Sequence, residues 1–144
     1  MGEFIADKVL KKLVIAGKNP IESKVVILGL TFKEHTPDTR NSKVEDIVIR
    51  LREHSIDSVI VDPWANSEDA MREYNVELTE LSDVQDADGV ILAVGHNEFK
   101  ALSLEDFDSL YKHDIPNEEK IIIDVKSILD KDLYVENNYA YWRL

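Results

Sequence analysis

Cysteine is absent from this 144-residue chain, and its absence excludes several kinds of chemistry within the chain. Without thiols there are no disulfide bonds, no thiolate metal sites and no cysteine nucleophile. Long apolar runs are absent too, since none approaches the roughly 18 residues of a membrane span. The first residues, Met1-Gly2-Glu3-Phe4, also lack the basic start and apolar core of a signal peptide. We therefore expect a cytoplasmic protein that does not act with a membrane.

Positively charged residues are few. Lys and Arg number 17 against 29 Asp and Glu, which gives a formal net charge of −12. A field of that sign repels a continuous polyanion such as DNA, so nucleic acid is excluded as a partner. A small anionic ligand is still compatible with this charge where a few cations gather locally.

Glycine is also rare, with five residues in the chain. A dinucleotide fingerprint, G-x-G-x-x-G, needs its later glycines to let the pyrophosphate and the helix approach the backbone. Only Gly29 stands at the matching strand end, and Leu30, Thr31 and Phe32 follow it. A Walker A loop is excluded in the same way, because no second glycine precedes Lys33. The sequence therefore predicts that the chain has no phosphate-cradling turn of its own.

Short apolar segments alternate with amphipathic ones from residue 24 onward. Four candidate strands are nearly uniformly apolar, as expected for strands covered on both faces: residues 24–28, 58–61, 89–94 and 120–124. Helical patterns begin between them at Ser42, Ser67 and Ser103, and a leading helix over residues 4–16 ends at Gly17. This alternation predicts an α/β fold: a Rossmann-like, open, mostly parallel sheet with helices on both faces, preceded by one helix.

Local signals specify some of these elements further. Residues 42–45 (SKVE) predict a capping box for the helix that follows them, and Ser103 is predicted to cap a later helix. Residues 76–78 and 80–84 are candidates for a short β segment and a short helical segment. The final residues, 139–144, are either a closing edge strand or a docked extended segment. The leading helix is unusually apolar, so it packs either on this domain or on something outside the chain.

Three cations lie at predicted carboxyl ends of strands, where sheets of this type bind ligands. Lys33 and Arg40 fall in the loop after the first strand, and Lys126 follows the fourth. An ammonium meets a phosphate as a point charge and a guanidinium binds it through two hydrogen bonds. The three cations therefore favour a phosphate-containing ligand. The alternative is that Lys33 and Arg40 are solvated or pair with Glu34 and Asp38.

Asp62 and His96 also lie at strand ends. An acid at the position of Asp62 contacts the ribose in true Rossmann domains, but without the glycines a structural role is favoured. A single histidine is more often a hydrogen-bonded structural residue than a catalyst, and the same interpretation is favoured for His96. A receiver-type phosphorylation domain is disfavoured, because it needs acids after the first strand, where Gly29 and Thr31 stand.

Ordered blocks of this sequence closely resemble the C-terminal domain of the UDP-glucose/GDP-mannose dehydrogenase family. They are residues 29–33 (GLTFK), 36–42 (TPDTRNS), 61–64 (VDPW), 87–88 (AD), 93–99 (AVGHNEF) and 123–126 (IDVK). The blocks follow the family's order and span nearly the whole chain, which makes the set more specific than any single motif. The segment DPWA, residues 62–65, is most similar to the branch that oxidises UDP-N-acetylhexosamines.

The resemblance implies that this chain is part of a longer enzyme. Family members join an N-terminal NAD-binding domain, a central helical region and a C-terminal nucleotide-sugar domain. They oxidise a sugar C6 alcohol to a carboxylate in two NAD-dependent steps, through a cysteine-linked thiohemiacetal. Residues 1–20 would then be the end of the central region, and residues 21–144 the nucleotide-sugar-binding domain. The catalytic cysteine and the NAD fingerprint would lie in the other domains, so this chain alone is expected to be inactive.

The resemblance also implies roles for single residues. Lys33, with Phe32 beside it, and Lys126 would contact the UDP-sugar. Arg40 would reach an NAD molecule held mainly by the N-terminal domain. His96 lies in a matched block without an implied role, and no residue of this chain is expected to be catalytic or to bind a metal. In the full-length protein, the N-terminal and central domains are the expected partners, together with a second copy in a homodimer.

A function of a different class is left open by the sequence: a stand-alone, non-catalytic nucleotide-binding or dimerisation module. The coding sequence upstream of Met1 distinguishes the two hypotheses. A G-x-G-x-x-G motif and a cysteine in frame there would support the dehydrogenase, whereas a natural start site with nothing before it would favour the module.

Overall fold

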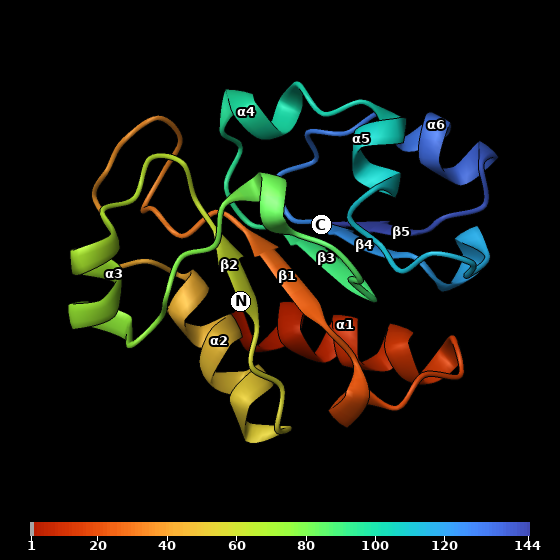
Figure 1. The fold of residues 1–144 in the computed structure, drawn as a ribbon, viewed down its shortest axis with the longest axis horizontal. Coiled ribbons are helices and arrows are strands. Elements are labelled where there is room, and N and C mark those ends of the chain that lie inside the picture. The colour runs from red at the N-terminus through yellow and green to blue at the C-terminus, as the bar shows by residue number, and fades with distance from the viewer. Residues whose placement is uncertain (1) are drawn as a thin grey trace.

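The computed structural model describes residues 2–144, which form a five-stranded sheet with helices on both of its faces (Figure 1). Met1, the first residue of the predicted 1–20 segment, lies outside the described residues. The strands are β1 (Val25–Leu28), β2 (Val59–Val61), β3 (Gly89–Leu92), β4 (Ile121–Asp124) and β5 (Ala140–Arg143). The helices are α1 (Gly2–Ile15), α2 (Val44–Glu53), α3 (Ser67–Tyr74), α4 (Asn97–Lys100), α5 (Leu104–Asp108) and α6 (Lys131–Glu136). Short 3-10 turns are η1 (Pro20–Glu22), η2 (Leu81–Asp83) and η3 (Asn117–Glu119).

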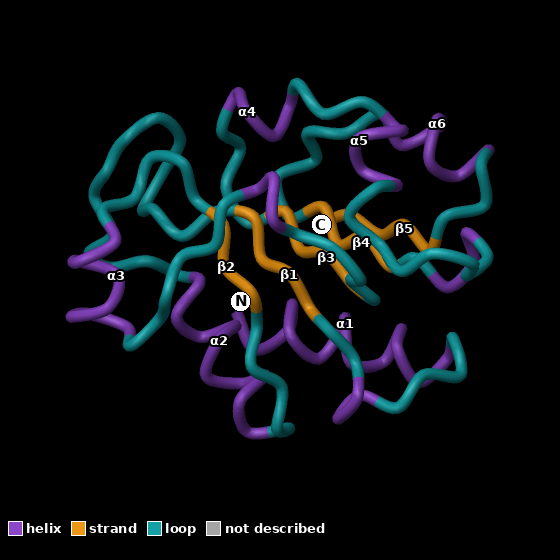
Figure 2. The backbone as a smooth tube through the Cα atoms, viewed as in Figure 1, coloured by secondary structure: helices purple, strands orange, loops and turns teal. Residues whose placement is uncertain are grey.

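The strands of the sheet follow the order β2-β1-β3-β4-β5, and each neighbouring pair is parallel. The predicted open, mostly parallel sheet is therefore confirmed. The chain winds outward in one direction from β1 to β2 and in the other from β3 to β5, so the winding reverses between β1 and β3. In doubly wound sheets the loops diverge at such a point, and ligands bind outside the carboxyl ends of the strands there. In Figure 2 the long loop after β1 and the loop after β2 leave the same end of the sheet.

Alternate residues of each central strand face opposite layers of helices. Val25 and Ile27 of β1 belong to the hydrophobic cluster that α1 and α2 complete, whereas Val26 and Leu28 belong to the cluster on the side of α5 and α6. All four side chains are fully buried. This two-sided burial is the reason that the strand reads as a continuous apolar run in the sequence.

The leading helix, predicted over residues 4–16, spans Gly2–Ile15 and packs on this sheet. Its buried stripe includes Ile5, Val9 and Leu13 and joins the same cluster as β1. The opposite side keeps exposed apolar residues, among them Ile15. Of the two sequence alternatives, packing on this domain is therefore confirmed. Whether the helix also ends a central helical region stays a prediction. The helices of residues 2–144 include none with the length and apolarity that crossing a membrane requires.

The capping box predicted over residues 42–45 is wrong. Helix α2 begins at Val44, and its N-cap residue, Lys43, makes no capping hydrogen bond with its side chain. The Ser42 hydroxyl accepts the Val44 amide at 3.2 Å, and the Ser42 amide donates to the Tyr74 hydroxyl at 3.2 Å. The tyrosine thus takes the amide that Glu45 would accept in a capping box.

Other local predictions agree with the structure. Ser103 and Asp106 form a reciprocal capping box at the start of α5. Leu78 makes a parallel bridge with Ile60, and residues 81–83 form a 3-10 turn. The final segment is the edge strand β5, which pairs with β4, and the docked extended alternative is excluded.

Candidate functional site

The loop that carries Lys33 and Arg40 begins at a glycine that the fold requires. Gly29 has a φ of 111°, in a region that favours glycine. A Cβ atom there would lie 2.5 Å from the Cβ and 2.8 Å from the backbone nitrogen of Val94. The backbone after β1 therefore lies against the backbone after β3, so the two loops at the reversal of strand order are in close contact.

The Asp62 carboxylate, at the end of β2, organises the start of this loop. One of its oxygens accepts the amides of Leu30 and Thr31 at 2.7 and 2.9 Å. Its other oxygen accepts the amides of Trp64 and Ala65 at 2.8 and 3.2 Å. The group therefore joins the first residues after β1 to the turn after β2. This geometry agrees with the structural role favoured from the sequence.

His96 completes the hydrogen bonding of that carboxylate. Its ring is fully buried, and its Nδ1 accepts the His35 amide at 3.1 Å. The proton of the neutral ring is therefore on Nε2, which lies 3.1 Å from an Asp62 oxygen and 3.1 Å from the Thr31 hydroxyl. The Thr31 hydroxyl in turn donates to the Lys33 carbonyl at 2.9 Å. Every polar atom of the imidazole is used for structure, which agrees with the interpretation favoured from the sequence.

The charge state of Asp62 follows from these contacts. Burial alone would raise its pKa, but the hydrogen bonds from His96 and from the amides of Leu30, Thr31 and Trp64 lower the pKa below its usual value. The carboxylate is therefore ionised at neutral pH. Because the donors already surround both oxygens, Asp62 is not available to a ribose hydroxyl.

The far end of the loop is attached to helix α3. The Tyr74 hydroxyl donates to the Thr39 carbonyl and accepts the Ser42 amide. The Thr39 hydroxyl donates to the Glu73 carboxylate at 2.6 Å. Arg40 lies between these two attachment points, so its backbone is held although its side chain is exposed.

The four predicted site residues are all exposed, and they differ in their partners. Phe32 is 54% exposed, and the Lys33 ammonium makes no ion pair or hydrogen bond within residues 2–144. Arg40 pairs with Asp38 at 3.1 Å, as the alternative interpretation of the sequence allowed. Across the same part of the chain, no hydrogen bond or ion pair joins two of the four side chains. Phe32 and Lys33 therefore lie together because they are neighbours in the sequence.

Lys126 lies on the β4 side of the same edge. The backbone amide of Glu34 donates to the Glu34 carboxylate and lowers the pKa of that group. The positive charge of Lys126 lowers the same pKa further. Lys126 is therefore close enough to Glu34 for their charges to interact. It also lines a small pocket of about 190 Å³ with an apolar floor, together with Lys43. The loop after β1 and the turn after β4 meet at Gly95, where an added Cβ would lie 3.4 Å from the Glu34 carboxylate and 3.4 Å from the Ile128 side chain.

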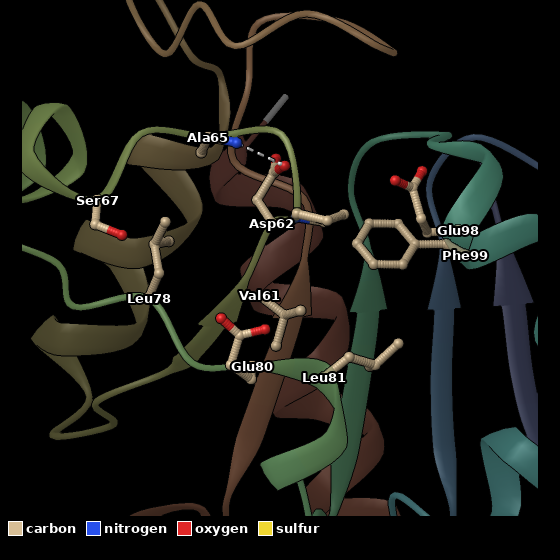
Figure 3. A pocket seen from close by; sticks show the side chains of 10 residues that line it. Val61, Asp62, Ala65, Ser67, Leu78, Glu80, Leu81, Glu98 and Phe99 are labelled. Carbon is tan, nitrogen blue, oxygen red and sulfur yellow. Dashed lines mark hydrogen bonds between the residues drawn. The ribbon is translucent and has the colours of Figure 1, made fainter.

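A second pocket, of about 370 Å³, opens beside the end of β2 (Figure 3). The acidic residues Asp62, Glu80 and Glu98 line it with apolar neighbours, and Figure 3 shows the bond from Ala65 to Asp62 at its rim. None of the predicted cations lines this pocket. Its acidic wall repels a diphosphate. A phosphate ligand therefore fits better on the lysine side of this edge of the sheet, where Lys33 and Lys126 lie. Within residues 2–144 no cluster of His, Asp and Glu is arranged to hold a metal ion.

The fold and the loop define a class of protein: a doubly wound α/β domain that presents a built loop at the carboxyl ends of its strands. Residues 26–131 match the UDP binding domain of the UDP-glucose/GDP-mannose dehydrogenase family, and the chain belongs to this family. The resemblance of the ordered sequence blocks is thereby confirmed.

The relatives place the chain within that family. It is 38% identical over 132 residues to UDP-N-acetyl-D-glucosamine 6-dehydrogenase from Pseudomonas aeruginosa, covering 92% of this chain and 30% of that protein. The structure of UDP-D-ManNAc dehydrogenase from Pyrococcus horikoshii aligns with a TM-score of 0.70 and 28% identity, covering 91% of this chain and 28% of that one. An NDP-N-acetyl-D-galactosaminuronic acid dehydrogenase from Methanosarcina mazei shares the fold, with a TM-score of 0.83 at 20% identity. The chain thus spans about 30% of the length of the relatives it matches.

Several residues of the site could not be assigned from the sequence. His35 adopts a positive φ of 56° and pairs with the turn after β3, yet no sequence pattern marks it. Tyr74 is one aromatic residue of an amphipathic helix, and its bonds to the loop depend on how α3 docks. The acidic pocket is formed by segments far apart in the chain. Asp62 was marked by its place at a strand end, and Glu98 only as part of the matched block 93–99.

Proposed function

We propose that this chain is the nucleotide-sugar-binding domain of an NAD-dependent UDP-sugar 6-dehydrogenase, which oxidises a sugar C6 alcohol to a carboxylate. The observation that carries the proposal is the match of residues 26–131 to the UDP binding domain of the family. Lys33, Phe32 and Lys126 contact the UDP-sugar in this proposal, and Arg40 contacts NAD. The chain supplies binding and orientation, and the thiolate and the NAD site belong to the remainder of the enzyme.

The charge distribution supports the assignment of Lys33. In a chain with a net charge of −12, an ammonium without an ion pair at the edge of the sheet attracts phosphate oxygens. Phe32 beside it offers an exposed aromatic face. The backbone beneath both residues is fixed, because the Phe32 amide donates to the Asp38 carbonyl at 2.7 Å. A ligand that binds here therefore meets an ordered loop.

Calorimetry with UDP-N-acetylglucosamine tests this assignment. The wild-type chain should bind weakly, and Lys33→Ala should weaken binding about tenfold, since a hydrogen bond to a charged group contributes roughly 1.5–3 kcal/mol. Lys131→Ala is the matched control, because Lys131 is an exposed lysine on α6 at the other side of the molecule. Equal affinities of the wild type and Lys33→Ala would overturn the role of Lys33. The absence of binding to any UDP-sugar would count against the proposed function.

The role of Arg40 requires the longer enzyme. Its guanidinium pairs with Asp38, and one arginine alone is a small binding surface for a dinucleotide. We therefore expect no measurable NAD binding to this chain. In the intact dehydrogenase, Arg40→Ala should raise the KM for NAD and leave the KM for the UDP-sugar nearly unchanged. An unchanged KM for NAD would exclude Arg40 from the cofactor site.

A further inference from the structure

We propose that His96 is a positioning residue for the nucleotide-sugar site: it fixes the loop that carries Phe32 and Lys33 through a reciprocal pairing with His35. The expected effect on UDP-sugar binding rests on the proposed function. The pairing of His35 with His96 is observed in this chain and does not depend on that function. His96 touches no ligand in this proposal and acts only through the loop.

The two histidines exchange hydrogen bonds between their loops. The His35 amide donates to Nδ1 of His96 at 3.1 Å, and the Asn97 amide donates to Nε2 of His35 at 2.9 Å. Each imidazole thus accepts a backbone N–H of the other loop. The loop after β1 and the turn after β3 are therefore joined in both directions. His35 is in the left-handed region, with a φ of 56°, which this pairing holds in place.

The buried surroundings of His96 keep its ring in one orientation. Its Nε2–H faces Asp62, whose carboxylate is itself fixed by backbone amides. The ring packs against Trp64, with centroids 6.1 Å apart and planes 20° apart, and against Phe99 at 5.6 Å. A flipped ring would turn Cδ2–H toward the His35 amide and Cε1–H toward the Asp62 carboxylate, so both hydrogen bonds would be lost. The other tautomer would turn the Nε2 lone pair toward that carboxylate. One tautomer in one orientation satisfies both neighbours.

The consequence is a short, doubly anchored segment. Thr31 is held by Asp62 and His96, and His35 is held by His96, so three residues lie between two fixed points. Phe32 and Lys33 are two of these three residues. Their backbone is ordered before any ligand arrives, which lowers the entropy lost on binding. Loss of the His35–His96 bond should therefore weaken UDP-sugar binding without removing a contact to the ligand.

Two substitutions separate the hydrogen bond from the filling of space. The side-chain oxygen in His96→Asn lies near the position of Nδ1, so this variant keeps an acceptor for the His35 amide. Because asparagine is smaller than glutamine, it leaves a larger cavity than His96→Gln does. His96→Gln fills nearly the space of the ring and can donate to Asp62, but it lacks the acceptor at Nδ1. We expect the His35 amide to exchange hydrogen about fivefold faster in His96→Gln than in His96→Asn. Equal exchange in the two variants, or faster exchange in His96→Asn, would reduce His96 to a core residue and overturn the proposal.

The affinity for UDP-N-acetylglucosamine should follow the same order. His96→Gln should bind about fivefold more weakly than His96→Asn, whose affinity should be close to that of the wild type. If the wild type binds no UDP-sugar, the proposed function fails while the exchange experiment still decides whether His96 holds the loop. If the wild type binds and the two variants bind equally, the positioning role fails and the proposed function stands.

The wild-type chain provides a test that does not depend on a folded variant. Long-range proton–nitrogen correlation spectra should show a neutral His96 ring with its proton on Nε2 and a bare Nδ1. A proton on Nδ1 would break the bond to the His35 amide and would overturn the proposal directly. His54 is an exposed internal reference, because it lies at the end of α2 outside this cluster.

Discussion

At the scale of single residues, the Asp62 carboxylate accounts for the shape of the loop. Its two oxygens accept four backbone amides from two segments, and His96 adds a fifth donor. Bonds to an ionised acceptor are stronger than neutral ones, and here those from Leu30, Thr31 and His96 are buried. One side chain thereby joins two loops and orders the first residues of each.

Replacing Asp62 with asparagine tests this account. Asp62→Asn keeps the size of the side chain but removes the charge, and its amide group would face N–H donors instead of accepting from them. We expect a loss of about 2–4 kcal/mol in the free energy of unfolding, measured by urea denaturation. Asp57→Asn is the control, because that carboxylate is 97% exposed and should change stability by less than about 0.5 kcal/mol. Equal stability of the two variants would contradict the role of Asp62.

Gly29 supports a second prediction at the same scale. In Gly29→Ala the new Cβ would contact the Val94 backbone at 2.8 Å, and the residue would keep a φ that disfavours side chains. We expect a loss of more than about 2 kcal/mol in thermal or urea unfolding. Gly17→Ala is the comparison, because Gly17 also has a positive φ but has open space around it. A smaller loss at Gly29 than at Gly17 would contradict the close approach of the two loops.

Single residues also show where sequence-based prediction ends. The structural role of Asp62 could be predicted, because the glycines that accompany a ribose-binding acid at this position are absent. The partners of His96 could not be predicted, because Thr31, His35 and Asp62 lie 65, 61 and 34 residues earlier in the chain. A hydrogen bond of that kind depends on the strand order, which the local sequence does not encode.

At the scale of elements, helix α3 holds the far end of the loop. Tyr74 binds the Thr39 carbonyl and the Ser42 amide, so the start of α2 is set from outside the helix. This contact is the reason that the predicted capping box fails. The β strands were easier to predict, because burial on both faces leaves a continuous apolar run. The four-residue helix α4 was not predicted, because it is too short to show a helical period.

Tyr74→Phe tests the attachment of α3. The substitution removes two hydrogen bonds and should cost about 1–2 kcal/mol of stability. It should also speed hydrogen exchange of the Ser42 amide, which would be left without its acceptor. Tyr141→Phe is the matched control, because it removes a hydroxyl bonded to Asp124 on the other side of the sheet. The attachment would be contradicted if the Ser42 amide exchanged equally fast in both variants.

At the scale of the whole molecule, buried carboxylates couple the fold to pH. Hydrogen bonds to Asp62 outweigh its burial and lower its pKa. Lys112 and Lys18 do the same for Asp88, which lies just before the amino end of the central strand β3. A group with a lowered folded-state pKa stabilises the protein above its unfolded pKa, about 3.9 for aspartate. That stability is lost as the pH falls from about 4 through the folded-state pKa values.

Urea unfolding from about pH 5 to about pH 2 measures this coupling. The free energy of unfolding should fall steadily over that range in the wild type. In Asp62→Asn the decrease should be smaller, since one of the responsible carboxylates is gone. A decrease of the same size in both proteins would show that Asp62 titrates alike in the folded and unfolded states.

The whole-molecule architecture was predictable because it depends on the alternation of strands and helices, which every segment repeats. The α/β class, the parallel sheet and the helices on both faces are confirmed. The family was also predictable, because its blocks are ordered along the chain. The roles of Phe32, Lys33, Arg40 and Lys126 stay predictions, since no contact within residues 2–144 assigns a ligand to them.

The central proposal is that this domain binds a UDP-sugar at the carboxyl ends of its strands, on the side where Lys33 and Lys126 lie. The most direct measurement is a nuclear magnetic resonance titration of the isotope-labelled chain with UDP-N-acetylglucosamine, which detects weak binding and locates it. We predict shifts in the amides of residues 30–40 and of Lys126 that saturate with ligand and are much reduced in Lys33→Ala. Amides that do not respond at any ligand concentration, or a response confined to the acidic pocket around Glu80 and Glu98, would contradict the account.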